Sequence, residues 1–136
     1  MTRAAARVIL FLGAFYLAIG ILFGAFAGQA ATQQLRVAWR WAAWIVSAAA
    51  FGAHILYEQV RLRSSPRTAA LHVASAAALG AFGLAVAANV HAQTVSGQRP
   101  LLLVLSLAIW PIMTAVPAFV VALIAAMLFA RARLSG

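Results

Sequence analysis

The chain has a single acidic residue, Glu58, and it stands close to residue types that exchange protons. His54 precedes Glu58 by four residues and Arg61 follows it by three, and positions three or four apart share one face of a helix. His72 lies in the next apolar block, at a depth that we expect to match that of His54. We therefore predict a polar cluster of His54, Glu58, Arg61 and His72 between two neighbouring helices.

Three interpretations of this cluster stay open. In the first, which we favour, Glu58 pairs with Arg61 or another arginine at the same membrane boundary and the histidines complete the network, because charges near the interface can reach water. In the second, His54 and Glu58 form a proton or ion relay, since ionisable groups within a span are functional candidates. In the third, His54 or His72 binds a tetrapyrrole, haem or chlorophyll, because neutral imidazole is a common axial ligand.

The sequence offers little else for catalysis. It contains no cysteine and only one carboxylate, so thiolate metal sites and multi-carboxylate metalloenzymes do not fit it. The serines of the apolar blocks lack a neighbouring acid other than Glu58, and no Gly-x-Ser-x-Gly elbow occurs. We expect no enzyme activity, no catalytic residues, no metal site and no resident cofactor.

The elements that must position the cluster are four apolar blocks separated by arginines. Hydrophobic residues make up 66% of the 136 residues and charged residues 8%, against about 25% charged residues in soluble domains. A helix needs about 20 mostly apolar residues to cross a bilayer. The blocks predict an all-α, integral membrane four-helix bundle, a single transmembrane domain. Its predicted spans are 8–28, 38–60, 67–92 and 101–130.

The arginines predict the orientation of this bundle. Of the ten, seven would lie on one side, at the two ends of the chain and between the second and third spans, and three on the other. Because arginine-rich loops stay in the cytoplasm, we expect cytoplasmic N and C termini, in the inner membrane of a bacterium. We expect the first block to be a retained span, since its apolar run is longer than the roughly 7–15 residues of a signal peptide core.

The second span begins with tryptophans interleaved with arginines: Arg36, Trp39, Arg40 and Trp41. Tryptophan prefers the headgroup region, and Arg36 and Arg40 are one helical turn apart, so both can contact lipid phosphate. We predict that these residues anchor the helix at the membrane interface. The net charge of +9 does not indicate nucleic-acid binding, because the arginines are distributed over the membrane boundaries and form no single basic face.

Glycines recur every four residues in the first span, at Gly20, Gly24 and Gly28. Such spacing places them on one face and lets another backbone approach closely. We predict that Gly20 and Gly24 lie at a helix–helix contact, with the partner either another helix of this chain or another subunit.

Two prolines, Pro111 and Pro117, interrupt the last block. Each removes a backbone donor and clashes with the preceding turn, so the sequence predicts a kinked helix. Ser106 and Thr114 are placed to help satisfy the carbonyl groups that the prolines leave unpaired.

These features favour a small accessory or structural subunit of a larger membrane protein complex, in contact with lipid and with other membrane subunits. The alternative is a small homo-oligomeric transporter or channel that uses His54 and Glu58. Tetrapyrrole binding through His54 or His72 is the third expectation.

Overall fold

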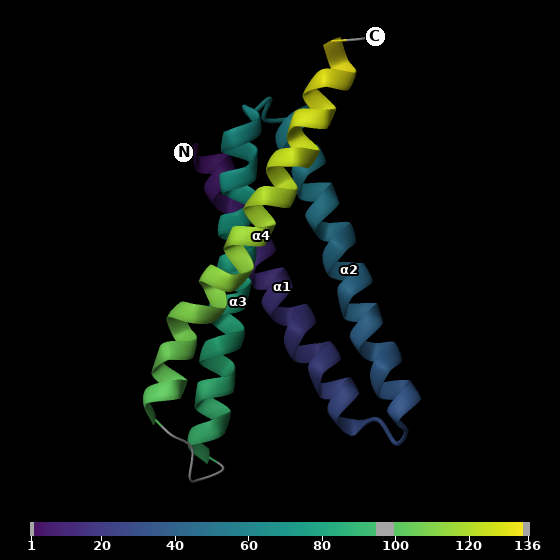
Figure 1. Cartoon of the computed structure of the whole chain (residues 1–136), viewed down its shortest axis with the longest axis vertical. Helices are drawn as coiled ribbons and strands as arrows, with labels where there is room; N and C mark the ends of the chain where they lie inside the picture. Colours follow the sequence, from purple (N-terminus) through teal and green to yellow (C-terminus); the bar gives the residue numbers. More distant parts are fainter. Residues whose placement is uncertain (1, 95–99, 135–136) are drawn as a thin grey trace.

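The computed structural model describes residues 2–94 and 100–134, which form four helices that run alternately up and down (Figure 1). The helices are α1 (Arg3–Gln29), α2 (Gln33–Val60), α3 (Pro66–Thr94) and α4 (Pro100–Leu134). The start of α1 and the end of α4 therefore lie at the same end of the molecule (Figure 1). The predicted all-α architecture is confirmed.

Residues with hydroxyl side chains cap the N-termini of three helices. Thr2, Thr32 and Ser65 each accept a hydrogen bond from the backbone N–H group three residues later, at 3.2, 3.2 and 3.3 Å. These bonds satisfy N–H groups that have no partner within the helix. At α3, Ser65 is followed by Pro66 as the first helical residue, where a missing N–H group costs nothing. The third predicted span, 67–92, begins one residue after this start of α3.

Three of the helices are long and apolar enough to cross a membrane: α1, residues 66–92 of α3, and residues 101–132 of α4. The protein is therefore a membrane protein. By composition α2 is not among the three, although the sequence analysis predicted four spans. However, α1 ends at the end of the molecule away from the chain termini, and α3 begins at the end that carries them (Figure 1). If α1 and α3 cross the bilayer, α2, which connects them, must cross it as well.

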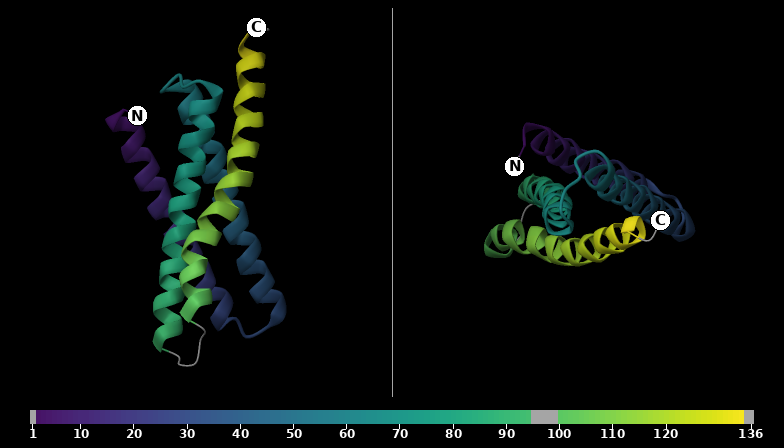
Figure 2. Two further views of the ribbon diagram at one scale, coloured as in Figure 1. Left: turned by 60° about the vertical axis from the view of Figure 1, so that its left-hand side comes forward. Right: turned by 90° about the horizontal axis from the view of Figure 1, so that it is seen from above.

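Helix α3 lies between α1 and α4 (Figure 2). Its contact with α1 is built from glycines of both helices. A methyl group on Gly13 or Gly20 of α1 would lie 2.6 Å from a side-chain carbon of Leu79 or Leu84 of α3, respectively. In the other direction, a methyl group on Gly80 of α3 would lie 2.6 Å from Cβ of Tyr16. Each helix thus inserts large side chains over the glycines of the other, as close packing in lipid requires.

The most buried apolar cluster joins α3 and α4 near the end that carries the chain termini, and one residue of α2 completes it. Its members are Ile55, Ala69, Ala70, Val73, Ala122 and Ala126. Four of the six are alanines, which allows the backbones of α3 and α4 to come close together. This cluster lies beside the turn between α2 and α3, where the predicted polar residues are found.

Helix α4 runs continuously through Pro111 and Pro117, and its ribbon is bent along its length (Figure 2). At 35 residues it is about 52 Å long at 1.5 Å per residue, so bending and tilt must absorb length beyond the roughly 30 Å hydrocarbon core. The hydroxyl of Thr114 donates to the carbonyl of Trp110, and that of Ser106 donates to the carbonyl of Leu103.

These two bonds correct a prediction. The prolines remove the helical partners of the Leu107 and Met113 carbonyls, and neither hydroxyl donates to those groups. A serine or threonine hydroxyl in a helix reaches the carbonyl three or four residues before it, which sets its acceptor regardless of where the proline stands.

Candidate functional site

The predicted polar cluster forms at the turn between α2 and α3. Glu58 and His54 lie one helical turn apart near the end of α2, and His72 faces them from the start of α3. His54 and Glu58 are buried, with 2% and 0% of their surface exposed, and the side chain of His72 is 13% exposed. The helical hairpin thus brings together three of the four residues that the sequence singled out.

The carboxylate of Glu58 has a different partner on each oxygen. The hydroxyl of Ser64 donates to Oε2 over 2.6 Å, and Nδ1 of His72 lies 2.9 Å from Oε1, at hydrogen-bond distance. Nε2 of His54 lies 3.7 Å from the same Oε1 atom, which is too far for a hydrogen bond. Neither ring nitrogen of His54 has a hydrogen-bond partner among the residues that the structure describes.

Arg61 is outside this cluster, although the sequence analysis included it and expected an arginine to pair with Glu58. Its side chain is exposed, while its backbone N–H group donates to the carbonyl of Tyr57 and ends α2. The carboxyl group of Glu58 instead has Ser64 and His72 at hydrogen-bond distance. Arg61 still has helical backbone angles (φ −91°, ψ −46°), but its side chain is exposed to the surroundings of the protein and not directed into the cluster.

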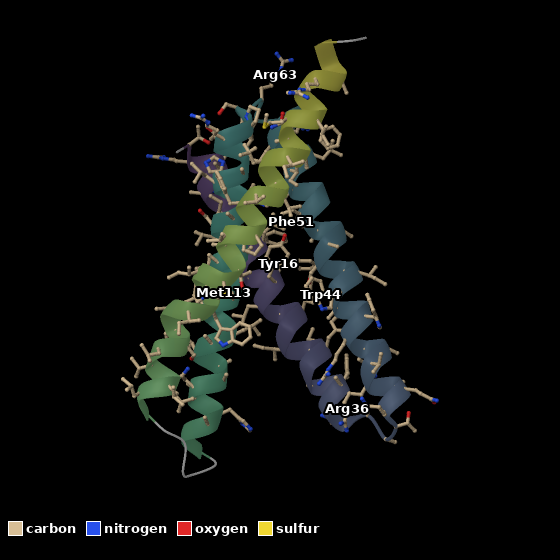
Figure 3. All side chains as sticks on the ribbon, in the orientation of Figure 1. Tyr16, Arg36, Trp44, Phe51, Arg63 and Met113 are labelled. Carbon is tan, nitrogen blue, oxygen red and sulfur yellow. The ribbon has the colours of Figure 1, made fainter. Side chains whose placement is uncertain are left out.

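The same turn is held by further bonds between α2 and Ser64. The backbone N–H group of Ser64 donates to the carbonyl of Glu58 over 3.0 Å, and the side-chain amide of Gln59 donates to the carbonyl of Ser64 over 3.3 Å. Arg63 adopts a positive φ of 49° and projects from the tip of the turn (Figure 3). Glu58 therefore binds Ser64 through both its backbone and its side chain, and clamps the turn closed.

Two imidazole rings approach the same oxygen atom of Glu58, and of the two only the ring of His72 lies at hydrogen-bond distance. Among the described residues, no group of three or more His, Cys, Asp or Glu side chains is arranged to hold a metal ion. Both His54 and His72 approach Oε1 of Glu58, and neither lines the cavity described below. Tetrapyrrole binding by these histidines stays a prediction.

The predicted packing glycines divide into two groups. Gly20 contacts Leu84 of α3, so it lies at a helix–helix contact. A methyl group on Gly24 or Gly28 would meet no atom of the described chain within 4 Å. The reason is that α1 and α3 cross near the middle of α1 and separate toward the connection between α1 and α2 (Figure 1).

The interface residues also separate by role. The ring of Trp39 packs on Phe23 and Phe26 of α1, with centroid distances of 5.9 and 4.9 Å, so it joins the two helices. Trp41 is exposed.

Next to this aromatic contact lies an open cavity of about 580 Å³ between α1 and α2. Its α1 wall includes Gly20, Gly24 and Gly28, and its α2 wall includes Arg36 and Arg40. Part of the predicted interface thus lines a groove within the protein. Gly24 and Gly28 leave this space open, because they have no side chains to fill it.

Two residues with structural roles were not identified from the sequence as site residues. Ser64 was not singled out, because its bond to Glu58 depends on the positive φ of Arg63 within the turn. Asn89 is 8% exposed and donates to the hydroxyl of Ser106 over 3.0 Å, joining α3 to α4. Its signal was present: it is the chain's single asparagine, within an apolar helix where such residues bond between helices.

Fold and site together define a membrane protein of four antiparallel helices, with a buried carboxylate–histidine cluster at the turn between α2 and α3. No protein-family model, no curated protein and no solved structure matches the chain.

Proposed function

We propose that this protein is a small subunit of a larger membrane assembly in the inner membrane of a bacterium. One observation carries the proposal: the least apolar helix, α2, is also poorly covered by the rest of the chain. Over residues 33–53 no residue of α2 is buried, and its buried residues lie only in the last two turns. A helix of low hydropathy is better accommodated in a bilayer when protein, and not lipid, surrounds it.

The exposed face of α2 also has the composition of a helix-docking surface. Its middle carries small residues at four-residue spacing: Ala48 and Gly52, and Ala49 and Ala53. A methyl group on Gly52 would meet no atom of the described chain within 4 Å. Small residues at this spacing let a second helix approach closely, which drives association in lipid. We name this surface, formed by Ala48, Ala49, Gly52 and Ala53, the α2 small-residue face.

The proposal is tested by affinity purification in mild detergent. The tagged wild-type protein should recover a stoichiometric partner protein. Gly52→Leu should lower the recovery of that partner at least about tenfold, because a side chain on the α2 small-residue face holds the backbones apart. The control is Ala108→Leu, which introduces the same leucine side chain at an exposed position of α4 and should leave the recovery unchanged.

Two results would contradict this function. One is a homogeneous particle that contains only this chain, and the other is a partner retained equally by wild type and by Gly52→Leu. The melting curve of Gly52→Leu in the same detergent shows whether the variant is folded, so loss of the partner can be separated from loss of the fold.

The buried cluster favours a second candidate, a small homo-oligomeric transporter in which His54 and Glu58 move a proton or an ion. Its specific observation is that His54 is buried 3.7 Å from the carboxylate, with no hydrogen-bond partner among the described residues. Liposome flux that is lost in Glu58→Gln and kept in Arg61→Gln would support it. The hydrogen bond from Ser64 holds Glu58 at the turn, which gives Glu58 a structural role and favours the first candidate function, a subunit of a larger assembly.

A further inference from the structure

The open groove between α1 and α2 combines a cationic end with an apolar wall. Arg36 and Arg40 lie one turn apart on α2, and Arg36 is found near the α1–α2 connection, at the end of the molecule away from the chain termini (Figure 3). The opposite wall is formed by α1 around Gly24 and Gly28. A charged end next to an apolar trough matches the two parts of an amphiphile.

The arginines of the groove lack an anion within this chain. Nε of Arg36 is buried from solvent and has no hydrogen-bond partner among the described residues. The one acidic side chain of the sequence, Glu58, lies near the opposite end of α2 and is bonded to Ser64 and His72. A second copy in the same orientation would place its Glu58 at that opposite side too. An anion that binds these arginines would therefore come from another molecule.

The depth of the two arginines fits the headgroup region. Arg36 is three residues and Arg40 seven residues from the start of α2 at Gln33, or about 4.5 and 10.5 Å along the axis at 1.5 Å per residue. Trp41, the residue after Arg40, is exposed, with 66% of its surface accessible, as in an aromatic belt. Guanidinium groups bind phosphate through paired hydrogen bonds, and basic pockets between membrane helices bind lipid headgroups.

The groove has the size of a ligand site. Its volume of about 580 Å³ falls within the roughly 300–1,000 Å³ that small-molecule sites occupy. We propose that the groove binds an anionic phospholipid, with the phosphate at Arg36 and Arg40 and an acyl chain along Gly24 and Gly28. The site is independent of the α2 small-residue face, which lies farther along the same helix.

The test is native mass spectrometry of the intact protein after exchange into detergent with phosphatidylglycerol or phosphatidylcholine. Wild type should retain phosphatidylglycerol about tenfold better. The double variant Arg36→Gln/Arg40→Gln should lose this preference, whereas the control Arg61→Gln/Arg67→Gln, at the other end of the molecule, should keep it. Neither double variant should invert the protein in the membrane, because the side with seven arginines keeps more arginines than the other side in both. Arg36→Gln/Arg40→Gln increases the difference in arginine number between the two sides, and Arg61→Gln/Arg67→Gln only reduces it.

A third variant tests the apolar wall. Gly24→Leu adds a side chain where no described atom lies within 4 Å, so it should leave the fold intact and lower the retention of both lipids. Glycerol 3-phosphate, which has the charge without an acyl chain, should not displace the lipid.

Four results would overturn the proposal. Two concern lipid retention: Arg36→Gln/Arg40→Gln retains phosphatidylglycerol as well as wild type does, or Gly24→Leu leaves the retention of lipid unchanged. The other two are displacement of the bound lipid by glycerol 3-phosphate and a copurifying protein that is lost in Gly24→Leu. The last would assign the groove to a partner helix. Loss of the partner in Gly52→Leu with lipid preference intact would separate this site from the proposed subunit interface.

Discussion

At the scale of residues, Glu58 shows how a carboxylate can be buried near the end of a membrane helix. Its burial would be costly without partners, and the hydroxyl of Ser64 and the ring of His72 offset the cost at 2.6 and 2.9 Å. Both partners lie beyond the end of α2, one in the turn and one on α3. The carboxylate is thus a tether between two helices as well as a buried charge.

The hydrogen bonds of Glu58 to Ser64 and His72 allow a prediction of what happens when the carboxylate is removed. Glu58→Ala should lower the free energy of unfolding by about 1–3 kcal/mol, because it leaves the partly buried partners of the carboxylate, Ser64 and His72, unpaired. Arg61→Ala, on an exposed side chain three residues away, should change it by less than about 0.5 kcal/mol. Thermal unfolding followed by circular dichroism in one detergent measures both. Equal melting temperatures for the two variants would show that Glu58 does not hold the turn.

The sequence could predict three members of this cluster and not the fourth. The four-residue spacing of His54 and Glu58 fixes a shared helical face, and the short connection to α3 places His72 opposite them. Ser64 enters through a turn in which Arg63 adopts a positive φ. No periodic pattern encodes that backbone conformation, since it arises only once both helices are packed.

At the scale of elements, the contact between α1 and α3 depends on where the helices cross. The spacing of Gly20, Gly24 and Gly28 assigns all three to one face, but the crossing point lies between Gly13 and Gly20. Spacing gives the face of a contact and the crossing angle gives its extent. The sequence therefore predicted Gly20 correctly and could not show that Gly24 and Gly28 would face an open groove.

This difference predicts opposite outcomes for two equivalent substitutions. In Gly80→Ala the new methyl group would lie 2.6 Å from Cβ of Tyr16 and 3.2 Å from the backbone oxygen of Gly13, neither of which can rotate away. We expect a loss of about 1–3 kcal/mol. In Gly24→Ala the methyl group meets nothing within 4 Å, so stability should be unchanged or rise by up to about 1 kcal/mol through the better helix propensity of alanine.

Detergent melting curves of Gly80→Ala and Gly24→Ala, measured side by side, decide this point. If Gly24→Ala melts as early as Gly80→Ala, Gly24 is also packed in the solution state, and a second copy or another helix must lie over it.

At the scale of the whole molecule, the α1–α2 pair and the α3–α4 pair diverge toward the end away from the chain termini (Figure 1). At the other end, Ile55 and Phe51 of α2 reach the core between α3 and α4, and the Glu58 cluster ties α2 to α3. The molecule is therefore closed at one end and open at the other. Its polar cluster lies at the closed end and its groove at the open end.

The two ends also differ in charge, which predicts the orientation in the membrane. The closed end carries the arginines near both chain termini and those of the α2–α3 turn, seven of the ten, and basic segments are retained in the cytoplasm. Because the chain has no cysteine, single-cysteine variants report one position each. Gln33→Cys at the open end should react with a membrane-impermeant maleimide in intact cells, and Arg61→Cys only after permeabilisation. The reverse pattern would place the groove at the cytoplasmic leaflet, and labelling of both in intact cells would mean that α2 does not cross the bilayer.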